Sequence, residues 1–200
     1  RHLFLIGALC TLAAGFTGCG APADTNSAKT QAILDMKRAT DHHSYSRPEE
    51  AVITHLNLNA AVDFDTRVIT ATATYDIETA DDAERIIFDC TDLNIKAVRV
   101  DGEAVDFEMG PAKQYIGQPL SFPVNANSQQ VSIDYESSPD AGALLWVEGD
   151  NPFLFTQSQA ILARTWVPCQ DSPGIRFTYE AHVDVPAGTM ALMSATNPTE

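Results

Sequence analysis

The stretch TQSQAILARTWVPCQDSPGIRFTYEAHVDV, residues 156–185, carries most of the information about the fold. Its last part, residues 175–185, strictly alternates apolar and polar residues. That period of two predicts a strand with one buried face and one face in water. Just before it, Pro168 and Pro173 bracket a short polar segment, in which fixed φ angles and missing N–H donors oppose regular pairing. Residues 168–173 are therefore predicted to form a rigid corner, called the proline corner below.

Two amide side chains precede the proline corner at alternate positions, Gln157 and Gln159. Alternate residues of a strand point to the same side, so we expect these amides to share one face of a strand. An apolar run follows at residues 160–163 and ends at Arg164. Taken alone, this pattern is most simply explained as the polar face of a solvated strand.

Short alternating runs continue from residue 52 through the rest of the chain. The two longest flank a turn at residues 63–67 and predict a hairpin, which their threonines favour. Asp101 and Gly102 predict a second hairpin, because glycine supplies the positive φ that a tight connection needs. The predicted strands are residues 52–62, 69–78, 85–90, 93–100, 104–109, 120–124, 131–135 and 144–147. Many short strands separated by turn residues predict an all-β sandwich or saddle-shaped domain.

Composition limits the classes of partner. The chain has 200 residues, of which 44% are apolar, enough for one well-buried core. Its formal net charge is −15, and binding to phosphates requires clustered Lys and Arg. We therefore expect no nucleic-acid partner. His42 and His43 are adjacent, so they do not point the same way in a regular element and make a poor metal site.

The first residues have the pattern of an export signal. A basic tip precedes an apolar stretch at residues 3–16, which fits a signal-peptide core and is too short to span a membrane. Small residues then precede Cys19, which resembles the lipobox of bacterial lipoproteins, although Phe16 stands where Leu is usual. The resemblance implies lipidation at Cys19 and a lipoprotein in the outer membrane or facing the periplasm. A plain secretory signal cut nearby is the alternative.

The order Gln-x-Gln-Ala, then Arg, then Trp-x-Pro-Cys-x-Asp-x-Pro and an aromatic-bearing strand resembles the zinc aminopeptidases of the aminopeptidase N type. It resembles their leukotriene hydrolase branch more closely, roughly over residues 50–200 and most densely over 155–194. The resemblance implies the saddle-shaped β-sandwich, amino-terminal domain of a gluzincin metalloaminopeptidase. We then expect a signal peptide at 1–18, a tether and lead-in at 19–50, and the β domain at 51–200, incomplete at its C-terminus and lacking the catalytic domain.

The same resemblance implies roles for particular residues. The Gln-x-Gln-Ala segment matches the family's substrate-recognition strand, so Gln157, Gln159 and Ala160 are the candidate substrate-binding residues. Many aminopeptidase N members carry Glu where this chain has Gln159, and the amide matches the leukotriene hydrolase branch. A Gln carbonyl accepts a hydrogen bond from an ammonium without the charge assistance of a carboxylate. Most of the charge recognition is therefore expected from a Glu outside this sequence.

No catalytic motif lies within the 200 residues. His-Glu-x-x-His, Gly-x-Ser-x-Gly, a phosphate loop and Cys-x-x-Cys are all missing from the sequence. The resembled enzymes hold zinc through residues of a following domain, so we expect zinc in the full-length parent, with none of its ligands here. The expected partners are peptide amino termini, the parent's own catalytic domain, and the membrane through Cys19.

The sequence leaves three functions open. The first is the cleft-capping domain of an exported zinc metalloaminopeptidase, which contributes substrate recognition while the parent hydrolyses amino-terminal residues from peptides. The alternative is a lipid-anchored β-sandwich binding module without catalysis. An inactive homologue that has lost its zinc ligands is the third.

Two pairs of residues carry predictions about structure. Cys90 and Cys169 could pair in an exported chain, but two separate buried thiols acting as small hydrophobes are favoured. Arg164 and Asp171 flank the start of the proline corner with opposite charges. We predict that they form an ion pair that locks the corner against the next domain.

Overall fold

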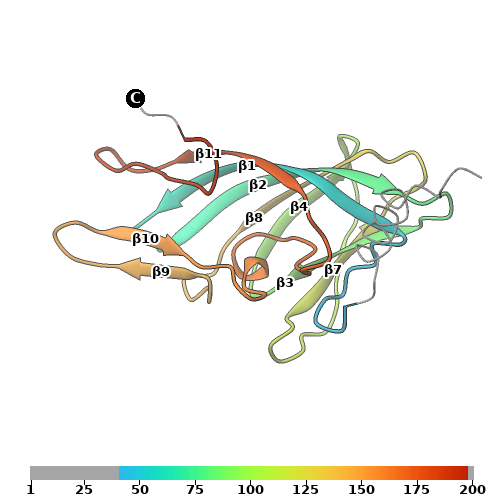
Figure 1. The fold of residues 1–200 in the computed structure, drawn as a ribbon, viewed down its shortest axis with the longest axis horizontal. Helices are drawn as coiled ribbons and strands as arrows, with labels where there is room; N and C mark the ends of the chain where they lie inside the picture. Colours follow the sequence, from blue (N-terminus) through green and yellow to red (C-terminus); the bar gives the residue numbers. More distant parts are fainter. Residues whose placement is uncertain (1–40, 198–200) are drawn as a thin grey trace, which may run out of the picture.

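The computed structural model describes residues 41–197 as three β-sheets (Figure 1). The predicted signal peptide, the predicted lipidation site Cys19 and most of the predicted tether lie outside the described residues. No helix among residues 41–197 is long and apolar enough to cross a membrane. The all-β fold predicted from the alternating sequence pattern is confirmed.

The largest sheet has six strands in the order β11-β1-β2-β8-β4-β5. All neighbours are antiparallel except β11, which pairs in parallel with β1. The six strands are β1 (Ala51–Asp63), β2 (Val68–Thr79), β4 (Asn94–Val100), β5 (Glu103–Ala104), β8 (Gln130–Glu136) and β11 (Thr178–Asp184). The predicted hairpin of the two long runs is the β1–β2 pair, which runs from Ala51 opposite Thr79 to Asp63 opposite Val68 with a register shift between Ile53 and His55.

Two smaller sheets lie below the six-stranded sheet in the view of Figure 1. One has the order β3-β7-β6 and the other is the hairpin of β9 and β10. Their strands are β3 (Arg85–Cys90), β6 (Glu108–Met109), β7 (Gln118–Pro123), β9 (Leu144–Val147) and β10 (Phe153–Thr156).

The core fills the space between the six-stranded sheet and the β3-β7-β6 sheet. Tyr75 of β2 is fully buried, and its ring centroid lies 5.1 Å from that of Phe88 in β3. Phe88 in turn stacks on Phe122 of β7, with centroids 5.6 Å apart. Because aromatic side chains bury much apolar area, this row links the two sheets strongly.

Turn chemistry and alternation predicted the local structure well, with two exceptions. Asp101 and Gly102 join β4 to β5 with φ angles of 50° and 87°, as the predicted hairpin requires. The alternation of residues 175–185 is also observed, with β11 beginning at Thr178. The single strand predicted at 104–109 is wrong: β5 pairs with β4, while β6 pairs with β7 in another sheet. The chain crosses between sheets there, which alternation alone does not reveal. The second exception is the Gln-x-Gln-Ala segment.

Candidate functional site

The Gln-x-Gln-Ala segment, residues 157–160, is an exposed turn and not the predicted strand. β10 ends at Thr156, opposite Leu144, where β9 begins, and one more bond crosses the hairpin, from the N–H of Gln157 to the carbonyl of Ala143 at 2.8 Å. Local bonds follow. The backbone N–H of Gln159 donates to the side-chain oxygen of Gln157 at 3.1 Å, and that of Leu162 donates to the carbonyl of Ser158 at 2.9 Å.

Because the segment is turned, Gln157 and Gln159 do not share a strand face. Both are exposed, as is Ala160, so the structure brings the three candidate residues together on one surface loop. The Gln157 side chain folds back on the backbone of its own segment. Gln159 is thus the better placed of the two amides to contact another molecule.

A buried charge cluster, formed by Arg164, Asp89 and Asp171, anchors the chain directly after this loop. Arg164 lies at the 3-10 turn η1 (Ala163–Thr165) and is 1% exposed. Its Nε lies 3.0 Å from Oδ2 of Asp171, so the predicted ion pair is confirmed. Its guanidinium also donates to the carbonyls of His43 at 2.9 Å, Ile116 at 2.6 Å and Asp171 at 2.7 Å. One side chain therefore joins the lead-in, the loop before β7 and the proline corner.

Asp89, at the end of β3, is the member of the cluster that the sequence analysis missed. It has no exposed surface and lies 3.7 Å from the Arg164 guanidinium. It accepts hydrogen bonds from the Ser44 hydroxyl at 2.6 Å and from the backbone N–H groups of Tyr45 at 2.7 Å and Asp171 at 3.0 Å. Burial raises the pKa of Asp89, while Arg164 and these donors oppose the rise. The available signal was an acid inside an otherwise apolar run, Ile86-Ile87-Phe88-Asp89-Cys90.

Gln170, which is 1% exposed, attaches the proline corner to β1 through hydrogen bonds of its side chain. Its side-chain oxygen accepts from the N–H of Ile53 at 3.0 Å, and its amide nitrogen donates to the carbonyl of Ala51 at 2.9 Å. Cys90 and Cys169 are both buried free thiols, as favoured from the sequence. Burial raises the pKa of each thiol, which makes both poor nucleophiles.

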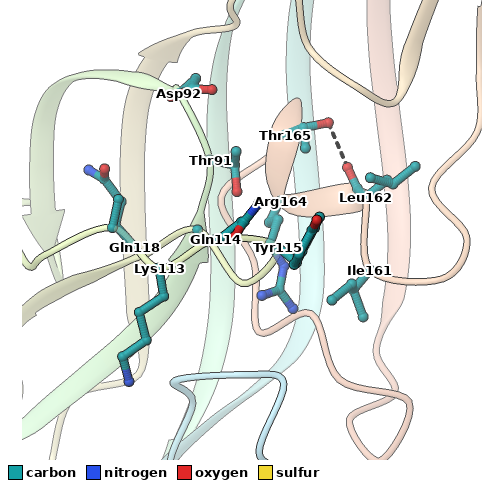
Figure 2. Close-up of a pocket in the computed structure, with 12 residues that line it drawn as sticks. Thr91, Asp92, Lys113, Gln114, Tyr115, Gln118, Ile161, Leu162, Arg164 and Thr165 are labelled. Atoms are coloured by element: carbon teal, nitrogen blue, oxygen red, sulfur yellow. Dashed lines mark hydrogen bonds between the residues drawn. The ribbon is translucent and has the colours of Figure 1, made fainter.

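A cavity of about 330 Å³ opens beside the cluster (Figure 2). Its walls come from the loop before β7 and the start of that strand, from the turn after β3 and from the chain around Arg164. They are formed by Thr91, Asp92, Ala112, Lys113, Gln114, Tyr115, Gly117, Gln118, Ile161, Leu162, Arg164 and Thr165. Tyr115 stands at its rim, 86% exposed and with a φ of 67°. The cavity therefore adjoins the end of the Gln-x-Gln-Ala segment.

The strands that lead into the segment expose an apolar surface, the apolar hairpin face. Leu145 of β9 and Phe155 of β10 are cross-strand partners, 59% and 52% exposed, and Phe153 on the same side is 53% exposed. The opposite side of the hairpin packs on the core, where the Trp146 ring lies 5.5 Å from that of Phe64. Exposed apolar side chains grouped in this way mark interaction surfaces.

Comparison with known proteins identifies the relatives of this fold. The sequence model of the Peptidase M1 N-terminal domain matches residues 52–199. The chain is 37% identical over 167 residues to leukotriene A-4 hydrolase of Xenopus laevis, covering 78% of this chain and 27% of that protein. It is 32% identical over 178 residues to leucine aminopeptidase 2 of Candida albicans, covering 86% of this chain and 28% of that protein.

Solved structures show the same architecture. Native yeast LTA4 hydrolase matches with a TM-score of 0.68 at 26% identity, over 74% of this chain and 25% of that one. An M1 zinc metallopeptidase from Deinococcus radiodurans matches with a TM-score of 0.62 at 18% identity, over 78% of this chain and 37% of that one. The chain thus spans about a quarter of the length of the curated relatives it matches.

Proposed function

This chain belongs to the M1 peptidase family as an N-terminal domain of its aminopeptidases, and we propose that it caps the active-site cleft of an exported zinc metalloaminopeptidase. In this proposal the parent hydrolyses amino-terminal residues from peptides, and this domain contributes substrate recognition. The observation that carries the proposal is the Gln-x-Gln-Ala segment, which is exposed and yet fixed at both ends by hydrogen bonds.

Gln159 is the residue we assign to the substrate. Its side-chain carbonyl is an acceptor suited to the α-ammonium of a peptide, and the residue beside it, Ala160, is small and exposed. Gln157 instead stabilises the loop, because its side-chain oxygen accepts from the N–H of Gln159. A neutral amide contributes hydrogen bonding without charge, so a carboxylate elsewhere in the parent is expected to complete recognition.

Zinc belongs to the parent in this proposal and not to the part of the chain described here. Within residues 41–197 no three His, Cys, Asp or Glu side chains are grouped so that they could hold a metal ion. His42 and His43 are both exposed on the lead-in. Zinc in the parent would activate the water that hydrolyses the peptide bond, and none of the described residues takes part in that step.

The apolar hairpin face supports an intramolecular partner. Phe155 lies two residues before Gln157, so a domain that contacts the Gln-x-Gln-Ala segment would also cover this face. The relatives are three to four times longer than the region matched here, which supplies such a domain. Lipidation at Cys19 and export complete the proposal and rest on the sequence pattern alone.

Substitution of Gln159 in the parent enzyme tests the proposal. Gln159→Ala removes one hydrogen bond to the substrate, and we expect the KM for aminoacyl substrates to rise about tenfold. Gln129→Ala removes an exposed amide directly before β8 and is the matched control, with KM unchanged. If the parent is active and Gln159→Ala leaves its KM unchanged, the assignment is refuted. A parent without peptidase activity would favour the lipid-anchored binding module.

A further inference from the structure

We propose that Thr165 and Trp166 are positioning residues that fix the shape of the Gln-x-Gln-Ala segment and thereby set its affinity for peptide amino termini. The inference rests on the proposed function of that segment. Neither residue needs to touch the substrate. Trp166 bonds to the segment directly, whereas Thr165 bonds to Ala143 and Leu162, the two residues that hold the segment from outside.

Thr165 connects the two ends of the segment. Its side chain is buried with the residue only 6% exposed, and its hydroxyl has two partners. The hydroxyl accepts from the N–H of Ala143 at 3.0 Å and donates to the carbonyl of Leu162 at 2.8 Å. Ala143 in turn accepts from the N–H of Gln157 at 2.8 Å. The Thr165 hydroxyl therefore links Ala143, which holds the start of the loop, to Leu162, whose N–H closes the loop on Ser158.

Trp166 holds the middle of the segment. Its indole N–H donates to the hydroxyl of Ser158 at 3.0 Å, and Ser158 lies between the two amides. The carbonyl of the same serine accepts from the N–H of Leu162 at 2.9 Å. Ser158 is thus fixed through both its side chain and its backbone, which restricts the conformations of the neighbouring Gln159.

The η1 turn can act as a fixed support because Arg164 precedes both residues and is buried in the charge cluster. The N–H groups of Trp166 and Val167 also donate to the carbonyl of Ala163, at 3.0 and 2.9 Å. A loop held in its binding conformation loses less conformational entropy when the ligand binds. Loosening the support should therefore weaken substrate binding more than it slows the chemical step.

Kinetics of three variants of the parent enzyme test this inference. Thr165→Val keeps the shape of the side chain and removes the hydroxyl, and Trp166→Phe removes the indole N–H. For each we expect KM to rise about five- to tenfold, as for the loss of one buried hydrogen bond, with kcat changed less than about twofold. Thr165→Ser retains the hydroxyl and should restore the KM of the unmodified enzyme.

Ser137→Ala is the control for a purely structural effect. Ser137 is 5% exposed, and its hydroxyl accepts from the N–H of Ile69 at 2.9 Å, so its loss also deprives a buried backbone donor of its partner. It should lower the melting temperature about as much as Thr165→Val does, without changing KM. Equal KM values for Thr165→Val and Ser137→Ala would overturn the inference.

Amide hydrogen exchange in the parent gives a second test that needs no activity. Thr165→Val should accelerate exchange at Gln157 and Leu162 about tenfold relative to the unmodified enzyme. Unchanged exchange at both amides would overturn the positioning role. The proposed function fails separately, when Gln159→Ala leaves KM unchanged in an active parent. If Gln159→Ala raises KM and Thr165→Val does not, only the positioning role is refuted.

Discussion

Replacing Arg164 with Met removes the only cation of the buried charge cluster and keeps a long side chain in its place. The substitution abolishes four side-chain hydrogen bonds, to Asp171 and to the carbonyls of His43 and Ile116. It also leaves Asp89, which has no exposed surface, without its cationic neighbour. The three donors to Asp89 from Ser44, Tyr45 and the Asp171 backbone remain.

The magnitude follows from this geometry. Removing one partner of a buried ion pair lowers the free energy of unfolding by about 3–5 kcal/mol, because the other charge stays buried and uncompensated. The donors that remain on Asp89 place Arg164→Met toward the lower end of that range. In a domain of this size, each kcal/mol shifts the melting temperature by about 2–4 °C, so we expect a fall on the order of 10 °C.

The loss should also depend on pH. Burial raises the pKa of Asp89 above its ordinary value of 3.8, and Arg164 opposes that rise. Without Arg164 the pKa of folded Asp89 rises further, so the folded variant keeps a proton that the unfolded chain has already released. Stability then falls as pH increases from the unfolded pKa through the folded one. The loss of unfolding free energy caused by Arg164→Met should therefore be largest at neutral pH and smaller near about pH 4.

Urea unfolding, followed by tryptophan fluorescence at both pH values, measures these differences. Arg99→Met is the matched control, because Arg99 pairs with Asp134 at 2.8 Å while the two side chains remain 40% and 30% exposed. An exposed pair contributes at most about 1 kcal/mol. If Arg164→Met destabilises the chain no more than Arg99→Met does, the cluster is not the anchor we describe.

Two further predictions concern the surroundings of the cluster. Gly117→Ala should destabilise the chain by more than about 2 kcal/mol, because a Cβ at its φ of 79° would collide with the carbonyl of Cys90 and the hydroxyl of Thr91. Gly102→Ala is the control. Gly102 has a φ of 87° but open space around it, so its substitution should cost only about 1 kcal/mol in the same urea titration. Cys90 and Cys169 should resist a thiol reagent in the folded chain at pH 8 and react once urea unfolds it, because both are buried and burial raises their pKa values; rapid labelling of the folded chain would contradict this.

The parts of the fold that the sequence predicted are those determined by neighbouring residues. Alternation set the faces of β2, of β11 and of β1 from His55 onward, and Asp101-Gly102 set a turn, because both signals act within a few residues. The register shift between Ile53 and His55 reverses the faces at the start of β1, where Ala51 and Ile53 are buried in place of Val52 and Thr54. The end of β10 is different. It depends on where β9 begins, at Leu144, so the sequence of residues 157–160 does not indicate that strand pairing stops there.

The candidate site shows the same division. Arg164 and Asp171 are seven residues apart, and their opposite charges made the ion pair predictable. Asp89 joins them from a strand more than 70 residues earlier, and the hydroxyl of Thr165 bonds to Ala143 across a separate hairpin. Such contacts follow from the packing of the sheets, so sequence alone gives the residue types without their partners.

The structure also separates two roles within the motif that relates this chain to its family. Arg164, Gln170 and Asp171 are buried or nearly so, and their polar atoms bond within the domain. Burial of such groups is tolerated only with partners, so these positions report on the fold. Gln159 is exposed, so the fold does not require a hydrogen-bond partner for its side chain. The proline corner therefore supports family membership and architecture, whereas the case for substrate recognition depends on Gln159 and on the residues that hold its loop.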